Sequence, residues 1–161
     1  MCIRDSAKAI AQGASRDLVG PKDALAELAA WFANAELSLS HIQRQMMAHK
    51  FAVSSVRCWP HHFDLSTLTT LPMRAAETTG YVGVGLSPGD EYYNEPYFYV
   101  SVYPDPDSTM LPDLPKFGHW HTHEFTAAVM PAQRLLTAHD QRVETDDFLQ
   151  AAVSAAIKLL S

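Results

Sequence analysis

Apolar residues recur at alternating steps of three and four between residues 22 and 49, the spacing of one face of an α-helix. The pattern predicts a long helix, with Pro21 suited to its first turn. Such a face packs on the chain's own sheet, which we favour, or forms a seam over residues 25–46 that joins two copies in a homo-oligomer. The face comprises Leu25, Leu28, Phe32, Ala35, Leu39, Ile42 and Met46.

Four later stretches are rich in residues that favour β-structure and alternate between apolar and polar positions, at least in part. They are residues 53–70, 81–87, 97–103 and 118–130. Within the first stretch, Pro60 has no amide hydrogen to donate to a neighbouring strand, so it predicts a bulge or a sheet edge. The pattern therefore predicts about four strands.

A second helical stripe covers residues 143–160, and Thr145 is its expected N-cap. The order is then helix, four strands, helix, and short connections favour antiparallel pairing of the strands. We predict an α+β fold in which an antiparallel, curved sheet of about four strands packs against a long N-terminal helix and a C-terminal helix.

The chain has 161 residues, which is most simply one domain. Its first six residues, Met1 to Ser6, match the translation of a transposon-end sequencing adapter. We expect them to be an artefact of assembly from metagenomic reads, to be left out of the fold. Residues 7–161 are then expected to form a single domain, with truncation of the natural N-terminus left open.

Composition and charge disfavour several functions. The 12 Lys and Arg against 18 Asp and Glu give a net charge of −6, which argues against a nucleic-acid partner. No apolar run approaches the roughly 20 residues that span a bilayer, so we expect no membrane insertion. With Cys2 in the adapter segment, Cys58 is the one native cysteine, which fits a reducing cytoplasm.

Histidines gather in two short clusters, His61 with His62, and His119, His121 and His123. Alternate strand residues face one side about 6.6–6.8 Å apart, so two of the second cluster could meet at one Zn, Fe, Mn or Ni ion. The same imidazoles could instead line a polar pocket or form a structural network. The metal hypothesis combines His61, His119 and His121 with a carboxylate from Asp64, Glu91 or Glu124.

Tyrosines and acids stand together between the second and third predicted strands and in the third strand itself. Tyr97, Tyr99 and Tyr103 alternate with apolar residues and so share one strand face. That face offers flat contact area to a ligand, or a helix covers it. Glu91 and Glu95 lie just before this strand, where a carboxylate could act as a general base or only cap a solvated turn.

Several sequence blocks carry a resemblance to known sequences. Residues 59–65 (WPHHFDL), 85–91 (GLSPGDE), 95–100 (EPYFYV) and 118–122 (GHWHT) resemble blocks in a group of uncharacterised bacterial proteins. The order of the blocks is remotely similar to the C-terminal half of a bacterial domain-of-unknown-function family. The resemblance implies a shared fold over about residues 53–160 and brings no known activity with it.

Three functions follow from these patterns. The first is a domain that binds a small polar ligand in a pocket lined by His, Glu and Tyr side chains. The second is a metal-dependent, hydrolase-like enzyme that uses the histidines to activate water. The third is an assembly protein acting through its long helix. The candidate site residues are His61, His62, Asp64, Glu91, Glu95, Tyr97, Tyr99, His119 and His121.

Overall fold

The computed structural model describes residues 22–72 and 79–160, so the adapter-like segment lies outside the described residues. One long helix precedes the strands in the sequence and another follows them, as predicted. The elements are α2 (Lys22–Ala48), β1 (Ala52–Val53), β2 (Arg57–Trp59), β3 (Asp64–Pro72), β4 (Thr79–Ser87), β5 (Tyr97–Tyr103), η1 (Ser108–Met110), β6 (His119–His121), β7 (Ala127–Pro131), α3 (Ala132–Leu135) and α4 (Gln141–Leu160).

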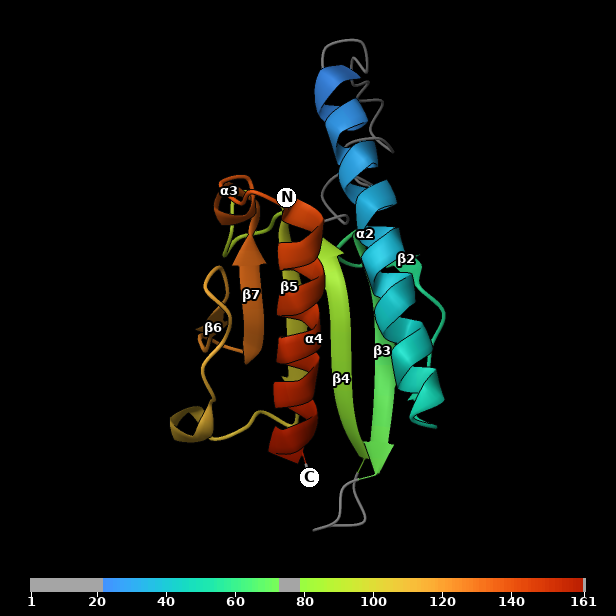
Figure 1. The fold of residues 1–161 in the computed structure, drawn as a ribbon, viewed down its shortest axis with the longest axis vertical. Helices are drawn as coiled ribbons and strands as arrows, with labels where there is room; N and C mark the ends of the chain where they lie inside the picture. The colour runs from blue at the N-terminus through green and yellow to red at the C-terminus, as the bar shows by residue number, and fades with distance from the viewer. Residues whose placement is uncertain (1–21, 73–78, 161) are drawn as a thin grey trace, which may run out of the picture.

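The strands form one antiparallel sheet in the order β1-β3-β4-β5-β7-β6, with β2 also paired to β3 (Figure 1). The α+β prediction is confirmed, but over the described residues the sheet has seven strands, where about four were expected, and its two edge strands do not pair with each other. Strand β7 lies between β5 and β6. After β5 the chain therefore forms the edge strand β6 first and then returns to place β7 between β6 and β5.

The three additional strands are β1, which pairs with the end of β3, and β2 and β6, which arise where a predicted strand reverses direction. Residues 118–130 form the β6–β7 hairpin, whose connection includes Glu124 in the left-handed region at φ 66°. Residues 53–70 divide in the same way, because a tight turn joins β2 to β3. The turn is closed by the Phe63 amide, which donates to the Trp59 carbonyl at 2.9 Å, and Phe63 has φ 59°. Pro60 therefore begins a hairpin turn and no bulge, and it directly follows β2, which pairs only with β3 among the described strands, as the alternative of a sheet edge predicted.

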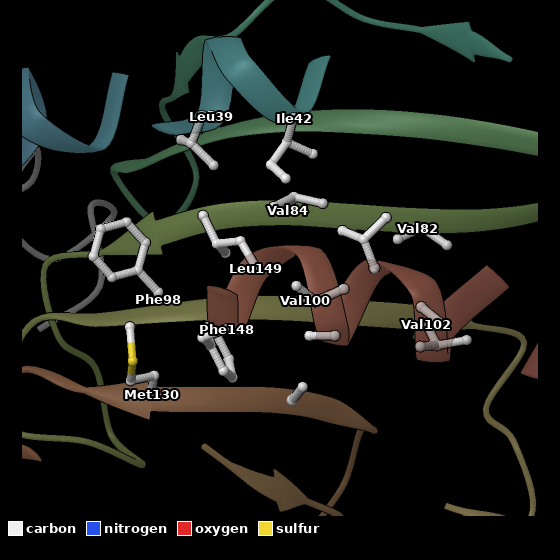
Figure 2. Close-up of a cluster of buried hydrophobic side chains, with 14 of the residues drawn as sticks. Leu39, Ile42, Val82, Val84, Phe98, Val100, Val102, Met130, Phe148 and Leu149 are labelled. Carbon is white, nitrogen blue, oxygen red and sulfur yellow. The ribbon is translucent and has the colours of Figure 1, made fainter. Parts of the chain in front are cut away.

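Helices α2 and α4 lie side by side on one face of the sheet (Figure 1). Figure 2 shows the apolar core between them and the strands, where Val84 and Val100 meet Leu149 and Phe148. These four side chains are at most 1% exposed. Burial of each large apolar side chain contributes roughly 1.5–3 kcal/mol, so this layer is the main source of stability.

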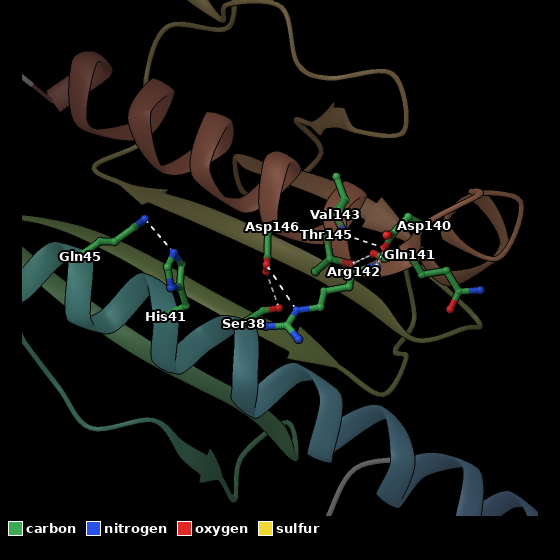
Figure 3. Close-up of polar contacts among 9 residues, drawn as sticks. All are labelled: Ser38, His41, Gln45, Asp140, Gln141, Arg142, Val143, Thr145 and Asp146. Atoms are coloured by element: carbon green, nitrogen blue, oxygen red, sulfur yellow. Dashed lines mark hydrogen bonds and ion pairs between the residues drawn. The ribbon is translucent and has the colours of Figure 1, made fainter.

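The apolar face of α2 is divided between two environments. Its C-terminal half, represented by Leu39 and Ile42, is buried on the chain's own sheet, as favoured above. Leu25 in its N-terminal half is 50% exposed, so part of the proposed seam is not covered by described residues. Midway, Ser38 donates a 2.6 Å hydrogen bond to Asp146 and so ties α2 to α4 (Figure 3).

Helix α4 begins one half-turn earlier than predicted. Asp140 accepts hydrogen bonds from the backbone amides of Arg142 and Val143, both at 3.1 Å (Figure 3). Asp140 is therefore the N-cap, and Thr145 lies inside the first turns and donates to the Gln141 carbonyl. Among the described helices, none combines the length and the apolar character needed to cross a membrane.

Candidate functional site

The second face of the sheet, called the open face below, carries no helix of the described residues and holds most of the predicted site residues. Antiparallel register places Ser66, Gly85, Tyr99, Val129 and His119 in one row across five strands. Directly paired residues point to the same side of a sheet, so this row lies opposite the apolar core. The tyrosine row therefore is not covered by a helix of the described chain.

The first hydrogen-bond chain on this face runs through Tyr99. Its hydroxyl donates to Asp64 and accepts from Ser66, so one phenol connects two positions of β3. The ring reaches β3 by crossing β4 at Gly85, where an added Cβ would lie 2.7 Å from the phenol oxygen. Burial, together with the charge and the hydrogen bond of Asp64, raises the pKa of Tyr99 well above its usual value. Tyr99 is therefore a neutral donor to a carboxylate acceptor.

A parallel chain runs through Tyr97. Its hydroxyl donates to Asp90 at 2.5 Å and accepts from Ser87. Burial, and then the hydrogen bond to Asp90, raises the pKa of Tyr97. The second Asp90 oxygen accepts from the backbone amides of Tyr92 and Tyr93 at 2.9 and 3.0 Å. This carboxylate therefore accepts three hydrogen bonds and holds the turn between β4 and β5.

The third chain joins two of the predicted histidines through a tyrosine. The Tyr93 hydroxyl lies 2.9 Å from Nε2 of His119 and 3.2 Å from Nδ1 of His121. His121 Nε2 lies 2.7 Å from the His123 carbonyl, which can only accept, so Nε2 carries the hydrogen. With neutral rings, Tyr93 then donates to His121, and His119 Nε2 donates to Tyr93.

This assignment leaves His119 Nδ1 as a bare acceptor. The atom is buried and has no hydrogen-bond partner among the described residues. Burial, and the positive charge of Arg134, lower the pKa of His119 from its ordinary 6.5, so the ring is neutral at neutral pH. An unsatisfied buried acceptor costs about 1–3 kcal/mol, so Nδ1 would gain from a hydrogen-bond donor.

Aromatic rings fill the middle of the open face. Tyr97, Ala127 and Val129 form a small second apolar cluster, 5% exposed or less, against which Tyr93 and Phe125 pack. The centroids of Tyr93 and Tyr97 are 4.8 Å apart. Tyr93 therefore holds the β4–β5 connection against the sheet through both its tilted ring contact with Tyr97 and its histidine contacts.

Two predicted residues lie away from these chains. His61 and His62 are exposed in the β2–β3 turn, with their rings 4.4 Å apart. They lie near β3, whereas His119 and His121 lie on β6, four strand spacings or about 19 Å across the sheet. Among the residues that the structure describes, no three His, Cys, Asp or Glu side chains are placed to hold a metal ion.

The acidic candidates also have separate positions. Glu91 is exposed, and Glu95 accepts a 2.6 Å hydrogen bond from the Gln133 amide at the start of α3. Glu124 accepts a hydrogen bond from Tyr92, an interaction that raises the pKa of Tyr92 to about 12. None of these carboxylates joins His119 and His121 through a hydrogen bond within the described structure.

Comparison with protein-family models decides the family. A model described as a family of unknown function, DUF5996, matches residues 34–161, well over half of the chain. The chain belongs to the DUF5996 family. Searches of the curated proteins and of the solved structures found no match. The matched part of this DUF5996 chain includes every strand and all three hydrogen-bond chains of the open face.

Four residues of the DUF5996 open face were absent from the predicted site. They carry or anchor the hydrogen-bond chains, and they are Ser66, Ser87, Asp90 and Tyr93. Strand alternation could have pointed to Ser66 because it shares a face with Asp64. No local pattern links Tyr93 to His119, because their contact depends on the position of β6 at the sheet edge.

The DUF5996 chain also has a cleft of about 440 Å³ on its helix-covered face. Trp31, Phe98, Leu135 and Arg142 are among the side chains that line it, between α2 and the start of α4. No predicted site residue lies there. The cleft and the open face are thus separate regions, and the hydrogen-bond chains belong to the open face.

Proposed function

We propose that this protein binds a small polar ligand on the open face, beside Asp64 and Tyr99. The observation that carries the proposal is that the Asp64 carboxylate is largely buried but accepts few hydrogen bonds. It is only 9% exposed, and it accepts one hydrogen bond from the described residues, from Tyr99. An ionised carboxylate has about four acceptor positions, so most of its capacity is left for a ligand.

The lack of a charged partner supports a binding role for Asp64. Its Oδ1 is not among the fully enclosed polar atoms that lack a hydrogen-bond partner, so a ligand can reach it. Asp64 has no ion pair with a described residue. The neutral Tyr99 hydroxyl orients one oxygen, so the carboxylate is held in a defined position for a second partner.

The neighbouring surface adds features of a ligand site. Tyr99 offers an aromatic surface over Gly85, and a small residue there lets the ring lie close to the backbone. Polar atoms of fixed direction beside apolar rings are typical of small-molecule sites.

The test is a screen of small polar compounds against the full chain by ¹H–¹⁵N NMR. We expect at least one compound to shift amide signals of β3, β4 and β5 around Asp64. The Asp64→Asn variant should weaken that compound about tenfold or more, because a hydrogen bond to a charged group contributes about 1.5–3 kcal/mol. Shifts confined to the α2–α4 cleft, or binding unchanged in Asp64→Asn, would contradict the proposal.

A further inference from the structure

We infer that the ligand of the open face carries a primary ammonium group, which Asp64 binds directly. The inference rests on the proposed binding function and specifies its ligand class. It comes from an inventory of hydrogen-bond donors, acceptors and charges around this carboxylate.

The hydroxyl donors of the three chains are already used. Tyr99 donates to Asp64, Tyr97 donates to Asp90, and Tyr93 donates to His121. Each phenol has one hydrogen, so none can donate a further bond to a ligand without breaking a chain. What is left on these groups is acceptor capacity. A ligand that supplies donors, as an ammonium group does with three, complements that surface.

Charge favours the same ligand class. Asp64 has no ion pair, and the ion pair within the described residues joins Arg142 to Asp146 on the other face. The cation nearest in register is Arg57, which is paired with Ser66. Its guanidinium carbon lies 4.0 Å from the centroid of the Trp59 ring, and it forms no ion pair with Asp64. The negative charge of Asp64 is therefore not neutralised by direct contact.

Two aromatic residues are close to Asp64, one through strand register and one through a hydrogen bond. Trp59 is directly opposite Asp64 in register, and Tyr99 contacts it through a hydrogen bond. The faces of aromatic rings attract cations, as the position of the Arg57 guanidinium over Trp59 illustrates. A carboxylate beside aromatic rings therefore favours an ammonium ligand over an alcohol of the same size.

Asp90 provides the matched control. It also accepts from a tyrosine on the open face, but its oxygens accept two backbone amides as well. Asparagine can keep those two amide contacts through its side-chain oxygen. The substitutions Asp64→Asn and Asp90→Asn thus remove the same charge, while the first removes more free acceptor capacity, because Asp64 accepts one hydrogen bond and Asp90 accepts three.

The experiment is an NMR titration of the full chain at pH 7 with n-butylamine, 1-butanol and sodium butyrate. We expect n-butylamine to bind beside Asp64 about 10–100-fold more tightly than 1-butanol, and butyrate to bind there still more weakly. Asp64→Asn should abolish the preference for the amine. Asp90→Asn should keep it within about threefold.

Two outcomes would overturn the inference. One is equal binding of amine and alcohol by the unsubstituted chain, a comparison that needs no variant to fold. The other is an amine preference that persists in Asp64→Asn. If amines fail while other compounds of the screen shift the Asp64 region, only the ligand class is wrong. If no compound shifts that region, the proposed binding function is wrong as well.

Discussion

The two faces of the same strands have opposite chemistry. On β4 and β5, Val84 and Val100 point into the helix-covered core, whereas their neighbours Gly85 and Tyr99 point to the open face. The first pair is stabilised by shape and apolar surface alone. The second pair depends on the direction of a hydrogen bond, because the Tyr99 hydroxyl must point to the Asp64 carboxylate. Adjacent residues of one strand therefore contribute apolar packing on one face and a directed hydrogen bond on the other.

The faces also differ in how their energy is distributed. The helix-covered face depends on many apolar contacts that add in small amounts. The open face depends on a few hydrogen bonds, each with a net contribution of about 0.5–1.5 kcal/mol. Substitutions on the first face should therefore change stability most, and substitutions on the second should change local geometry and titration.

The largest effect is expected from Phe148→Ala in the core. Phe148 is 1% exposed, so its truncation should lower the free energy of unfolding by about 3–5 kcal/mol in urea denaturation. Val143→Ala on the same helix is the control. Val143 is 51% exposed, and its change should stay within about 0.5 kcal/mol. A similar loss in the free energy of unfolding for both variants would disprove the expected difference between the buried and the exposed side chain.

A smaller effect is expected from Gly85→Ala on the open face. The new Cβ would lie 2.6 Å from the Ser66 Cβ and 2.7 Å from the Tyr99 ring, so the Tyr99–Asp64 hydrogen bond should be displaced. Overpacking of this kind costs about 1–3 kcal/mol, measurable by urea denaturation.

The matched control for Gly85→Ala is Gly83→Ala. Its nearest contact is the Ser101 hydroxyl oxygen at 2.6 Å, which can rotate away, and its other contacts lie at 3.9 Å. We expect less destabilisation there. An equal loss in the two variants would show that strand β4 simply does not accept a side chain.

The smallest effect is a pH dependence from His119. Burial and the charge of Arg134 lower its pKa below 6.5 in the folded chain, while the unfolded chain titrates near 6.5. Between these values the unfolded chain binds more protons, so this contribution to stability is complete above pH 6.5 and is lost as pH falls. Urea midpoints measured from pH 7.5 to pH 5 should therefore decrease less in His119→Gln than in the unsubstituted chain.

His139→Gln is the control for that titration, because His139 is exposed and lies outside the histidine cluster. It should keep the pH dependence of the unsubstituted chain. A His119→Gln variant with an unchanged profile would place the acid-sensitive group elsewhere and would argue against a neutral His119–Tyr93 hydrogen bond.

Local sequence pattern was enough for much of the fold. The apolar face of α2 and the alternation in β4 and β5 predicted the elements correctly, and they predicted the buried sides of both strands and of the C-terminal half of α2, because periods of 3.6 and 2 follow from backbone geometry. The hairpins at residues 60–63 and 122–126 were missed. There the backbone reverses with Phe63 and Glu124 at positive φ, a conformation for which these residue types give little warning.

The candidate site was predicted in its residue types but not in its grouping. Alternation by itself placed Tyr97 and Tyr99 on one face, opposite the apolar row. Only the tertiary structure decided that Tyr99 meets Asp64, that Tyr93 joins His119 to His121, and that His61 lies about four strands from them. Strand order depends on contacts between residues far apart in the chain, and alternation within one strand carries no information about which strand lies beside it.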